Sequence, residues 1–292
     1  VYDSDAHACI VDGVRLHMGK SFMFRHNDVE SLEKNLERAT KVAEEQGGGI
    51  LVVTEGVFGM RGEQGRLKEI CALKDRFQFR LLVDDAHGFG TLGKTGAGAG
   101  EEQGCQEQID VYFSTFAKSM AGFGAFIAGE KDIIGILKYN LRSQVFAKSL
   151  TMPMVIGGLK RLELLRSRPE IKEKLWYNVH KLQDGLRARG FNLGNTNTCV
   201  TPVYMEGTPV EATLLSRDLR ENYGIFTSVV VYPVIPKGMI LLRLIPTASH
   251  TDSEIDETLA AFESIHEKLV AGVYKEQANK LLEEQNLSFK EI

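Results

Sequence analysis

The sequence of 292 residues lacks the features by which several classes of protein are recognised. It has four cysteines and no Cys-x-x-Cys pair, so zinc and redox motifs are not predicted and reduced thiols are expected. The net charge of −4 gives no electrostatic support to nucleic-acid binding. No apolar run is long enough to cross a bilayer, and no signal-peptide pattern is found. We therefore expect a cytoplasmic protein, and peripheral attachment at the inner membrane surface stays open.

The composition is that of a globular protein, with 43% hydrophobic and 25% charged residues. This length can hold one large or two ordinary domains. Residues 154–189 have a helical, amphipathic pattern broken at Pro169, which is typical of a connection between domains. We expect a large domain at residues 1–155 and a smaller one at 156–292. Because Val1 opens directly on a strand pattern, we also expect an N-terminal portion of the natural protein to precede it.

Strand and helix patterns alternate along the first half of the chain. Residues 50–54 form a continuous apolar run with β-branched residues, which predicts a buried strand, and residues 79–83 and 111–113 predict two more. Residues 29–42 and 66–77 have apolar side chains at helical spacing. This alternation predicts an α/β fold with a parallel sheet and crossover helices.

Polar side chains stand where these strands end. Glu55, Asp84, His87 and Lys118 all lie at predicted strand ends, where ligands of parallel sheets bind. Lys118 lies between small and hydroxyl-bearing residues, where an amine can be desolvated and made nucleophilic, as a Schiff-base lysine requires. Pyridoxal phosphate needs such a lysine for its aldehyde, an acid for its ring nitrogen and a polar partner for its ring hydroxyl. The residues therefore favour a pyridoxal-phosphate site.

Two other cofactor classes compete with this interpretation. Residues 88–93 match the Gly-x-Gly-x-x-Gly pattern of nicotinamide-binding proteins, but residues 94–100 are too rich in glycine to begin the required helix. A flexible loop near a ligand is the better prediction for this segment. Asp84, Asp85 and His87, with His7, contain metal-ligand groups, but their spacing matches no metal motif. His7 alone is equally typical of a helix cap or a core histidine.

The second half of the chain predicts further strands, and residues 13–23 of the first half predict a loop. The strand patterns lie at residues 199–205, 225–231 and 239–245. Arg243 interrupts the last of these, so it is either an edge residue or a receptor for a carboxylate. Residues 251–254 form a capping box for a final helix.

Six ordered motifs resemble those of the α-oxoamine synthases, a family of fold-type I pyridoxal-phosphate enzymes. They are the His7 segment (similar to D-x-x-x-H-A-S), His26-Asn27-Asp28 (H-N-D), Thr54 to Phe58 (T-E-G-V-F), Asp84 to Gly88 (D-[DE]-A-H-G), Thr115 to Lys118 (T-[FL]-[SGA]-K), and Arg243 with Ala248 to Thr251 (R-x-x-x-x-A-x-H-T). Residues 117–126 most resemble the soluble bacterial serine palmitoyltransferases within this family. The resemblance implies a mostly parallel sheet with helices on both faces and a smaller C-terminal α+β domain.

The resemblance also implies roles for the residues that match the cofactor motifs. Lys118 is expected to bind the cofactor aldehyde, Asp84 to pair with the pyridine N–H, and His87 to contact the ring hydroxyl. Thr115 is expected to hold the phosphate. Ala147 stands where the family has a hydroxyl that reaches the partner subunit's phosphate, so Lys148 or a backbone amide is expected to substitute.

The remaining implied roles concern the substrate. His7 is expected to stack on the cofactor ring and to bind the substrate carboxylate, and Arg243 to steady that carboxylate. Gly59 stands where many relatives have serine.

The implied activity is that of a homodimeric serine C-palmitoyltransferase with shared active sites. Such an enzyme condenses L-serine with palmitoyl-CoA and releases CoA, CO2 and 3-oxosphinganine, the first step of sphingolipid synthesis. Sister enzymes with the same chemistry stay open, namely 8-amino-7-oxononanoate synthase, glycine C-acetyltransferase and 5-aminolevulinate synthase. A non-catalytic partner subunit is the alternative from another class, and the presence of Lys118, Asp84 and His7 argues against it.

Overall fold

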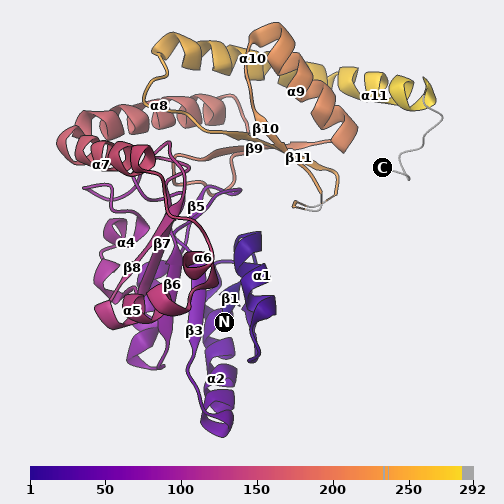
Figure 1. Cartoon of the computed structure of the whole chain (residues 1–292). Helices are drawn as coiled ribbons and strands as arrows, with labels where there is room; N and C mark the ends of the chain where they lie inside the picture. The colour runs from indigo at the N-terminus through magenta and orange to yellow at the C-terminus, as the bar shows by residue number, and fades with distance from the viewer. Residues whose placement is uncertain (233, 236, 285–292) are drawn as a thin grey trace. The chain divides into compact units, whose positions relative to one another are not determined.

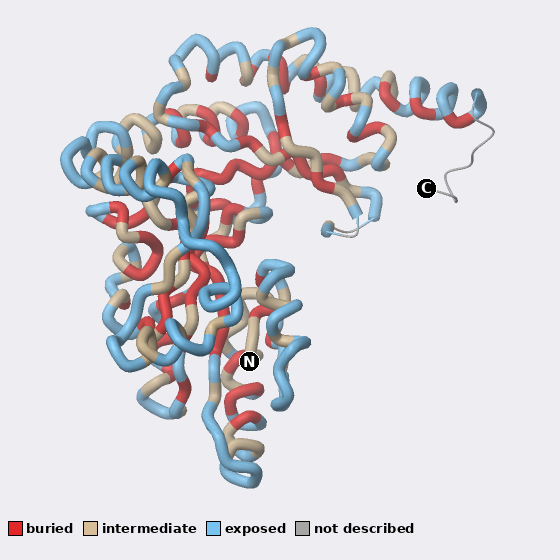
Figure 2. The backbone as a smooth tube through the Cα atoms, in the orientation of Figure 1, coloured by how far each residue is buried: buried red, intermediate tan, exposed pale blue. Residues whose placement is uncertain are grey.

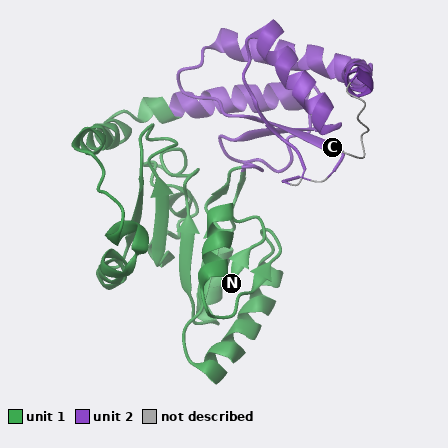
Figure 3. Cartoon of the chain, turned by 45° about the vertical axis from the view of Figure 1, so that its right-hand side comes forward, with its two compact units in different colours: residues 1–59, 63–172 green, residues 60–62, 173–292 purple. Residues whose placement is uncertain are grey.

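The computed structural model describes residues 1–232, 234–235 and 237–284, and its path is drawn in Figure 1. The chain forms two compact units (Figure 3). Unit 1 comprises residues 1–59 and 63–172, and unit 2 comprises residues 60–62 and those from 173 onward. The expected domain boundary between residues 155 and 156 stays a prediction.

Unit 1 is built on a six-stranded sheet in the order β2-β1-β3-β6-β7-β8. The strands are β1 (Tyr2–Asp3), β2 (Met23–Phe24), β3 (Leu51–Glu55), β6 (Arg80–Asp84), β7 (Val111–Thr115) and β8 (Ala125–Gly129). Every neighbouring pair is parallel except β7 and β8, which are antiparallel. The predicted parallel sheet is therefore confirmed, with one antiparallel strand at its edge.

Helices and a short hairpin complete unit 1. They are α1 (Ala8–Leu16), α2 (Val29–Gln46), the hairpin β4 (Val57–Phe58) and β5 (Glu63–Gln64), α3 (Leu67–Ala72), α4 (Ala99–Glu102), α5 (Lys131–Asn140), α6 (Arg142–Val145) and α7 (Met152–Ser167), with 3-10 turns at Leu73–Asp75 and Gln106–Gln108. The expected loop at residues 13–23 is wrong for its first part, because α1 continues to Leu16. None of the residues of α1 is buried, although Ile10, Val11 and Val14 recur at helical spacing.

Local sequence explains where α2 begins and which face it buries. Asp28 is its N-cap, and the Asp28 carboxylate accepts a 2.8 Å hydrogen bond from the Ser31 amide. Leu32, Leu36 and Ala39 recur at helical spacing and are buried. The strand residues Val52, Leu81 and Val83 are completely buried. Figure 2 shows how the buried residues are distributed along the chain. The sheet of unit 1 is thus covered by the apolar faces of its helices, as its continuous apolar strands require.

Unit 2 has a three-stranded antiparallel sheet in the order β10-β11-β9. Its elements are most of α8 (Pro169–Ala188), β9 (Thr201–Glu206), α9 (Pro209–Tyr223), β10 (Ser228–Val230), β11 (Met239–Leu244), α10 (Asp252–Val270) and α11 (Val273–Glu284). The three strands fall within or beside the predicted ranges, and the predicted capping box at Thr251 and Glu254 is present. The core of the unit is apolar and includes Phe262, Leu215 and Ile240.

The α/β fold predicted from the alternation of strands and helices is confirmed. Within the described part of the chain, no helix combines the length and the apolar composition that a membrane crossing needs.

Candidate active site

Three neighbouring strands of unit 1 end at the same edge of the sheet and carry polar residues there. Glu55, the last residue of β3, is in register with Asp84, the last residue of β6. Asp84 is in register with Phe113 of β7, and Lys118 follows that strand by three residues. The positive charge of Lys118 lowers the pKa of both Glu55 and Asp84, which burial raises. The structure therefore brings together the lysine and the acid that the sequence predicted for one site.

Lys118 is exposed and lies in a tight turn after β7. The turn is closed by hydrogen bonds from the Ala121 amide to the Lys118 carbonyl (2.9 Å) and from the Gly122 amide to the Phe116 carbonyl (2.7 Å). Ala121 adopts a positive φ of 42°, which is uncommon for a residue with a Cβ. This backbone presents the amine at the sheet edge instead of continuing the strand.

Asp84 is a buried carboxylate, with 7% of its surface exposed. One of its oxygens, Oδ1, accepts a hydrogen bond from the Ala86 amide at 3.0 Å. Burial raises the pKa of Asp84, whereas that hydrogen bond and the charges of Lys118 and His7 favour the ionised form. A buried anion of this kind fits a partner that carries an N–H and a positive charge, such as a pyridinium nitrogen.

His7 approaches the same edge as the N-cap of α1. Its Nδ1 accepts a hydrogen bond from the Cys9 amide at 3.3 Å, and its own amide donates to Glu55 Oε1 at 2.6 Å. Because the Cys9 amide donates to Nδ1, Nε2 is the ring nitrogen that carries a proton and can act as a donor. Of the two structural interpretations of His7, the helix cap is confirmed. Its stacking on a cofactor stays a prediction.

His87 is half-buried and lies against Gly59. A Cβ added at Gly59 would collide with Nε2 of His87, so the glycine makes the room that the imidazole takes. A serine at position 59 would not leave His87 in this place. The contact of His87 with a cofactor hydroxyl stays a prediction.

Thr115 ends β7, and its hydroxyl serves the turn that follows. The Thr115 Oγ1 donates to the Gly124 carbonyl at 3.0 Å and accepts from the Ala117 amide at 3.1 Å. A phosphate would therefore replace one of these bonds, and the phosphate role of Thr115 stays a prediction. The same holds for the substitution expected at Ala147, which is exposed.

Arg243 belongs to unit 2, where it is half-buried in β11. Burial lowers the pKa of its guanidinium, and Nη1 faces the Met60 sulfur at 3.7 Å. A half-buried cation beside a thioether gains from an anionic ligand, which is compatible with a carboxylate receptor. That role stays a prediction.

Asp85 is the residue that sequence reasoning left without a role. It is completely buried, and its Oδ2 accepts hydrogen bonds from the Ala99 amide (2.8 Å) and the Tyr112 hydroxyl (2.9 Å). Burial raises its pKa to about 6. Cβ atoms added at Gly56, Gly88 or Gly98 would collide with its carboxylate. The buried side chain of Asp85 thus connects the ends of β3 and β6 to β7 and α4. In the sequence, this role was indicated by three glycines in separate segments.

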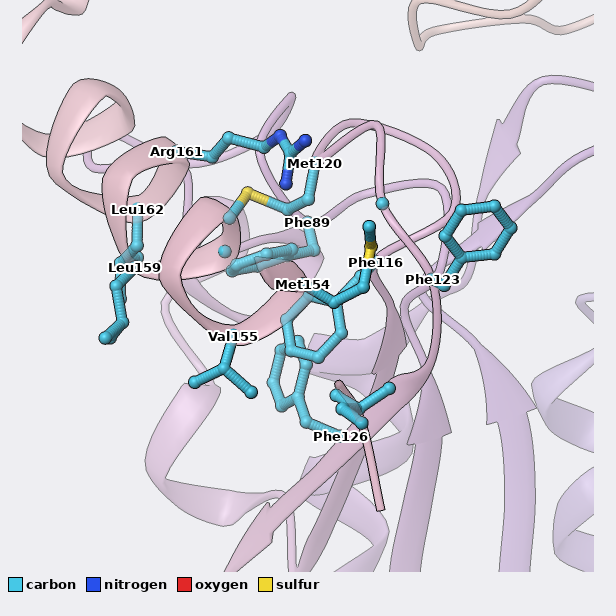
Figure 4. Close-up of a pocket in the computed structure, with 13 residues that line it drawn as sticks. Phe89, Phe116, Met120, Phe123, Phe126, Met154, Val155, Leu159, Arg161 and Leu162 are labelled. Atoms are coloured by element: carbon cyan, nitrogen blue, oxygen red, sulfur yellow. The ribbon is translucent and has the colours of Figure 1, made fainter. Parts of the chain in front are cut away.

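An apolar pocket of about 380 Å³ lies beside the lysine turn (Figure 4). Phe116, Met120 and Phe123 of that turn line it together with Phe126 of β8 and residues of α7. The guanidinium of Arg161 lies at its rim in the same view. The turn that carries Lys118 therefore lies between the sheet edge with Glu55 and Asp84 and this apolar pocket.

The chain is similar to known proteins in both sequence and structure. Residues 1–262 match the family model of the aminotransferases of class I and II. The chain belongs to this family. Its sequence is 68% identical over 275 residues to a cysteate-C-fatty acyltransferase of Capnocytophaga ochracea, covering 94% of this chain and 66% of that protein. It is 36% identical over 257 residues to a serine palmitoyltransferase of Sphingobacterium spiritivorum, covering 88% and 63%.

Solved structures agree with this assignment. A serine palmitoyltransferase of Sphingomonas wittichii matches with a TM-score of 0.85 and 34% identity, over 93% of this chain and 66% of that one. Another with the same TM-score and 32% identity, over 93% and 67%, is described as SPT with PLP internal aldimine. The resemblance to α-oxoamine synthases and the fold-type I architecture are confirmed, and the predicted cofactor agrees with these relatives. The chain spans about two thirds of the length of the curated relatives it matches.

Proposed function

We propose that this chain is part of a pyridoxal-phosphate-dependent acyltransferase that condenses L-cysteate with a fatty acyl-CoA. The observation that carries the proposal is the 68% identity to the cysteate-C-fatty acyltransferase over 94% of the chain. The serine predicted from sequence is the second candidate, supported by the serine palmitoyltransferases at 36% identity and by the solved structures. Both substrates need the same cofactor and the same bond-making step, and they differ in the group on Cβ.

The residues at the sheet edge fit pyridoxal phosphate. Lys118 would hold its aldehyde, Asp84 its ring nitrogen, and His87 its ring hydroxyl. When bound, the cofactor supplies an electron sink that stabilises negative charge at the substrate Cα. The buried anion of Asp84 is suited to keep the ring nitrogen protonated, because a carboxylate shielded from water pairs strongly with an N–H cation.

The overall reaction makes one carbon–carbon bond. The substrate Cα loses a proton and bonds to the acyl carbonyl carbon, and the thioester C–S bond breaks to release CoA as a thiol. The substrate carboxylate leaves as CO2, and a proton takes its place on Cα. Lys118 is the base at hand for the Cα proton, and the Nε2–H of His7 is a donor for the substrate carboxylate.

A second copy of the chain is the proposed partner. Phe123, Tyr139 and Phe146 are 71%, 76% and 75% exposed, and all lie in the segment from the lysine turn to α7. Large apolar side chains that are exposed are compatible with an interface. We expect Tyr139→Asp with Phe146→Asp to shift the full-length protein toward the monomer in analytical ultracentrifugation. An unchanged sedimentation coefficient would contradict a dimer through this segment.

The deciding experiment uses the full-length protein loaded with pyridoxal phosphate. L-cysteate, L-serine, glycine and L-alanine are each added while the visible absorption of the cofactor is recorded, and palmitoyl-CoA is then supplied and the products weighed by mass spectrometry. A saturable shift with L-cysteate and a sulfonate-bearing amino ketone would support the proposal. A response to L-serine alone would establish the second candidate, and a response to glycine or L-alanine alone would point to a sister enzyme.

A further inference from the structure

Glu55 is a buried acid at the candidate site to which no role has been assigned. It ends β3 and is only 6% exposed. Its register partner Asp84 ends the neighbouring parallel strand β6, so the two carboxyl groups emerge side by side at one sheet edge. Both are shielded from water, which makes two simultaneous negative charges costly.

Three further groups act on Glu55. The His7 amide of the loop before α1 donates to Oε1 at 2.6 Å. Lys118, after β7, brings a positive charge, and Asp3 at the end of β1 brings a negative one. Glu55 and Asp84 in turn act on the thiol of Cys9 in the first turn of α1, where their charges add to burial in raising its pKa. The charge of Lys118 thus acts on both Glu55 and Asp84, and Asp3 repels a charge on Glu55.

These surroundings divide the pair unequally. Two adjacent buried carboxyls share a proton, because the second ionisation must overcome both burial and repulsion. Burial, followed by the charge of Asp84, raises the pKa of Glu55 to about 8. Each carboxyl has a backbone amide and the charge of Lys118 to favour its ionised form, but Asp3 adds repulsion at Glu55 whereas the charge of His7 favours ionised Asp84. The proton therefore belongs on Glu55.

We propose that Glu55 is a positioning residue that stays a neutral carboxylic acid at neutral pH, fixes the His7 backbone through its carbonyl oxygen, and leaves Asp84 as the charged member of the pair. As an acid, Glu55 accepts the His7 N–H without adding a second negative charge beside Asp84. This proposal rests on the proposed function only for the roles given to His7 and Asp84.

The first test needs no substrate. Glu55→Gln keeps the shape and the acceptor but does not titrate, and the urea midpoints of the wild-type and variant proteins are compared from pH 5 to pH 9. A raised carboxyl pKa costs the folded wild type stability as the pH rises from its ordinary value toward about 8. The midpoint of the variant should therefore rise relative to that of the wild type up to about pH 8 and then level off. A difference that stays constant over this range would overturn the proposal.

A second variant keeps the test valid where Glu55→Gln does not fold. Asp84→Asn removes the neighbouring charge, so the pKa of Glu55 should fall. The pH above which the urea midpoint stops decreasing should therefore be lower in this variant than in the wild type. An unmoved levelling pH would overturn the sharing of one proton between the two groups.

A third measurement addresses positioning and depends on the proposed function. The kcat/KM of the holoenzyme should fall above about pH 8 as Glu55 ionises, and Glu55→Gln should lack that alkaline limb while Glu55→Asp should retain one. An alkaline limb at the same pH in the Gln variant would overturn the role of Glu55. Absence of turnover with every amino acid would count against the proposed function and leave the denaturation result unaffected.

Discussion

The two units of this chain bury carboxylates in different ways. In unit 1 the buried acids Asp3, Glu55, Asp84 and Asp85 stand at or just beyond the ends of parallel strands. Among the described residues of unit 2, Glu211 is the only buried acid, and it closes the capping box of α9. Its carboxylate accepts hydrogen bonds from the Thr208 amide (2.8 Å) and hydroxyl (2.7 Å).

The difference separates residues that support the fold from residues that cost it free energy. Glu211 satisfies helix donors that would otherwise lack partners, so its burial stabilises unit 2. Glu55 and Asp85 have raised pKa values, caused first by burial, so ionising either group costs unit 1 folding free energy. Buried acids with raised pKa values around a lysine are typical of a site where chemistry is done.

The strongest test of this comparison is Lys118→Ala. Loss of the amine should lower the activity with fatty acyl-CoA by roughly 10³-fold or more, because the lysine both holds the cofactor and takes the proton. Lys118 is exposed, so the folded protein should survive, as circular dichroism would show. The matched control is Lys41→Ala, at an exposed position of α2, which should keep full activity. Retained activity in the Lys118 variant would remove the lysine from the mechanism.

Phe262→Ala tests the opposite side, the apolar core of unit 2. Phe262 is completely buried, so its loss should reduce the free energy of unfolding by about 3–5 kcal/mol, measured by urea denaturation. The matched control is Phe226→Ala, because Phe226 is 81% exposed and its loss should cost no more than about 0.5 kcal/mol. Similar losses in the two variants would mean that the described core does not carry the stability.

Asp85→Asn tests, through the pH dependence of stability, whether the buried charge of Asp85 destabilises unit 1. The folded pKa of about 6 lies above the ordinary value, so the wild type loses stability as the pH rises from about 4 to about 6. Asparagine keeps the volume and an acceptor for the Ala99 amide without the charge. Its free energy of unfolding should rise relative to that of the wild type by about 3 kcal/mol between pH 4 and pH 7.

The control for this measurement is Asp132→Asn, an exposed acid in α5. Because Asp132 is exposed, its replacement should change the free energy of unfolding far less than Asp85→Asn does. A pH-independent difference for Asp85→Asn would show that the burial of its charge is not costly.

The smallest effect is expected from Glu211→Ala. Loss of the capping box should cost about 1 kcal/mol of unfolding free energy, because the first turn of α9 loses its side-chain acceptor. Glu206→Ala, at an exposed position just before this helix, is the control and should be nearly neutral. A loss near zero would mean that Glu211 does not stabilise unit 2, and the contrast with the buried acids of unit 1 would no longer hold.

The sequence allowed the sheet and part of the site to be predicted. Continuous apolar runs indicated parallel strands, and the rule that such strands end at one edge was enough to group Glu55, Asp84 and Lys118. It could not indicate what the adjacent Asp85 does, because its partners, the Ala99 amide and the Tyr112 hydroxyl, depend on how the chain turns after β6. Helix α1 was missed because it has only nine residues, with Gly13 among them, which is too short for its apolar spacing to stand out. The hydrogen bonds of the Thr115 hydroxyl were equally invisible, since Gly124 meets it only after the turn has formed.

The crowding of Asp85 by three glycines has a consequence for how related sequences can diverge. Gly56 and Gly88 have ordinary backbone angles, and a collision with this one carboxylate is what excludes a side chain there. Gly98 has in addition a φ of 107°, which favours glycine whatever its surroundings. A lineage that replaced Asp85 with a smaller residue would free position 88 to accept alanine, and position 56 where the Ala99 Cβ, which an added Cβ would meet at 3.0 Å, also moved aside, while position 98 would stay glycine. The tolerance of two distant sites is therefore conditional on a third, an epistatic coupling that an alignment of relatives would register as correlated substitution.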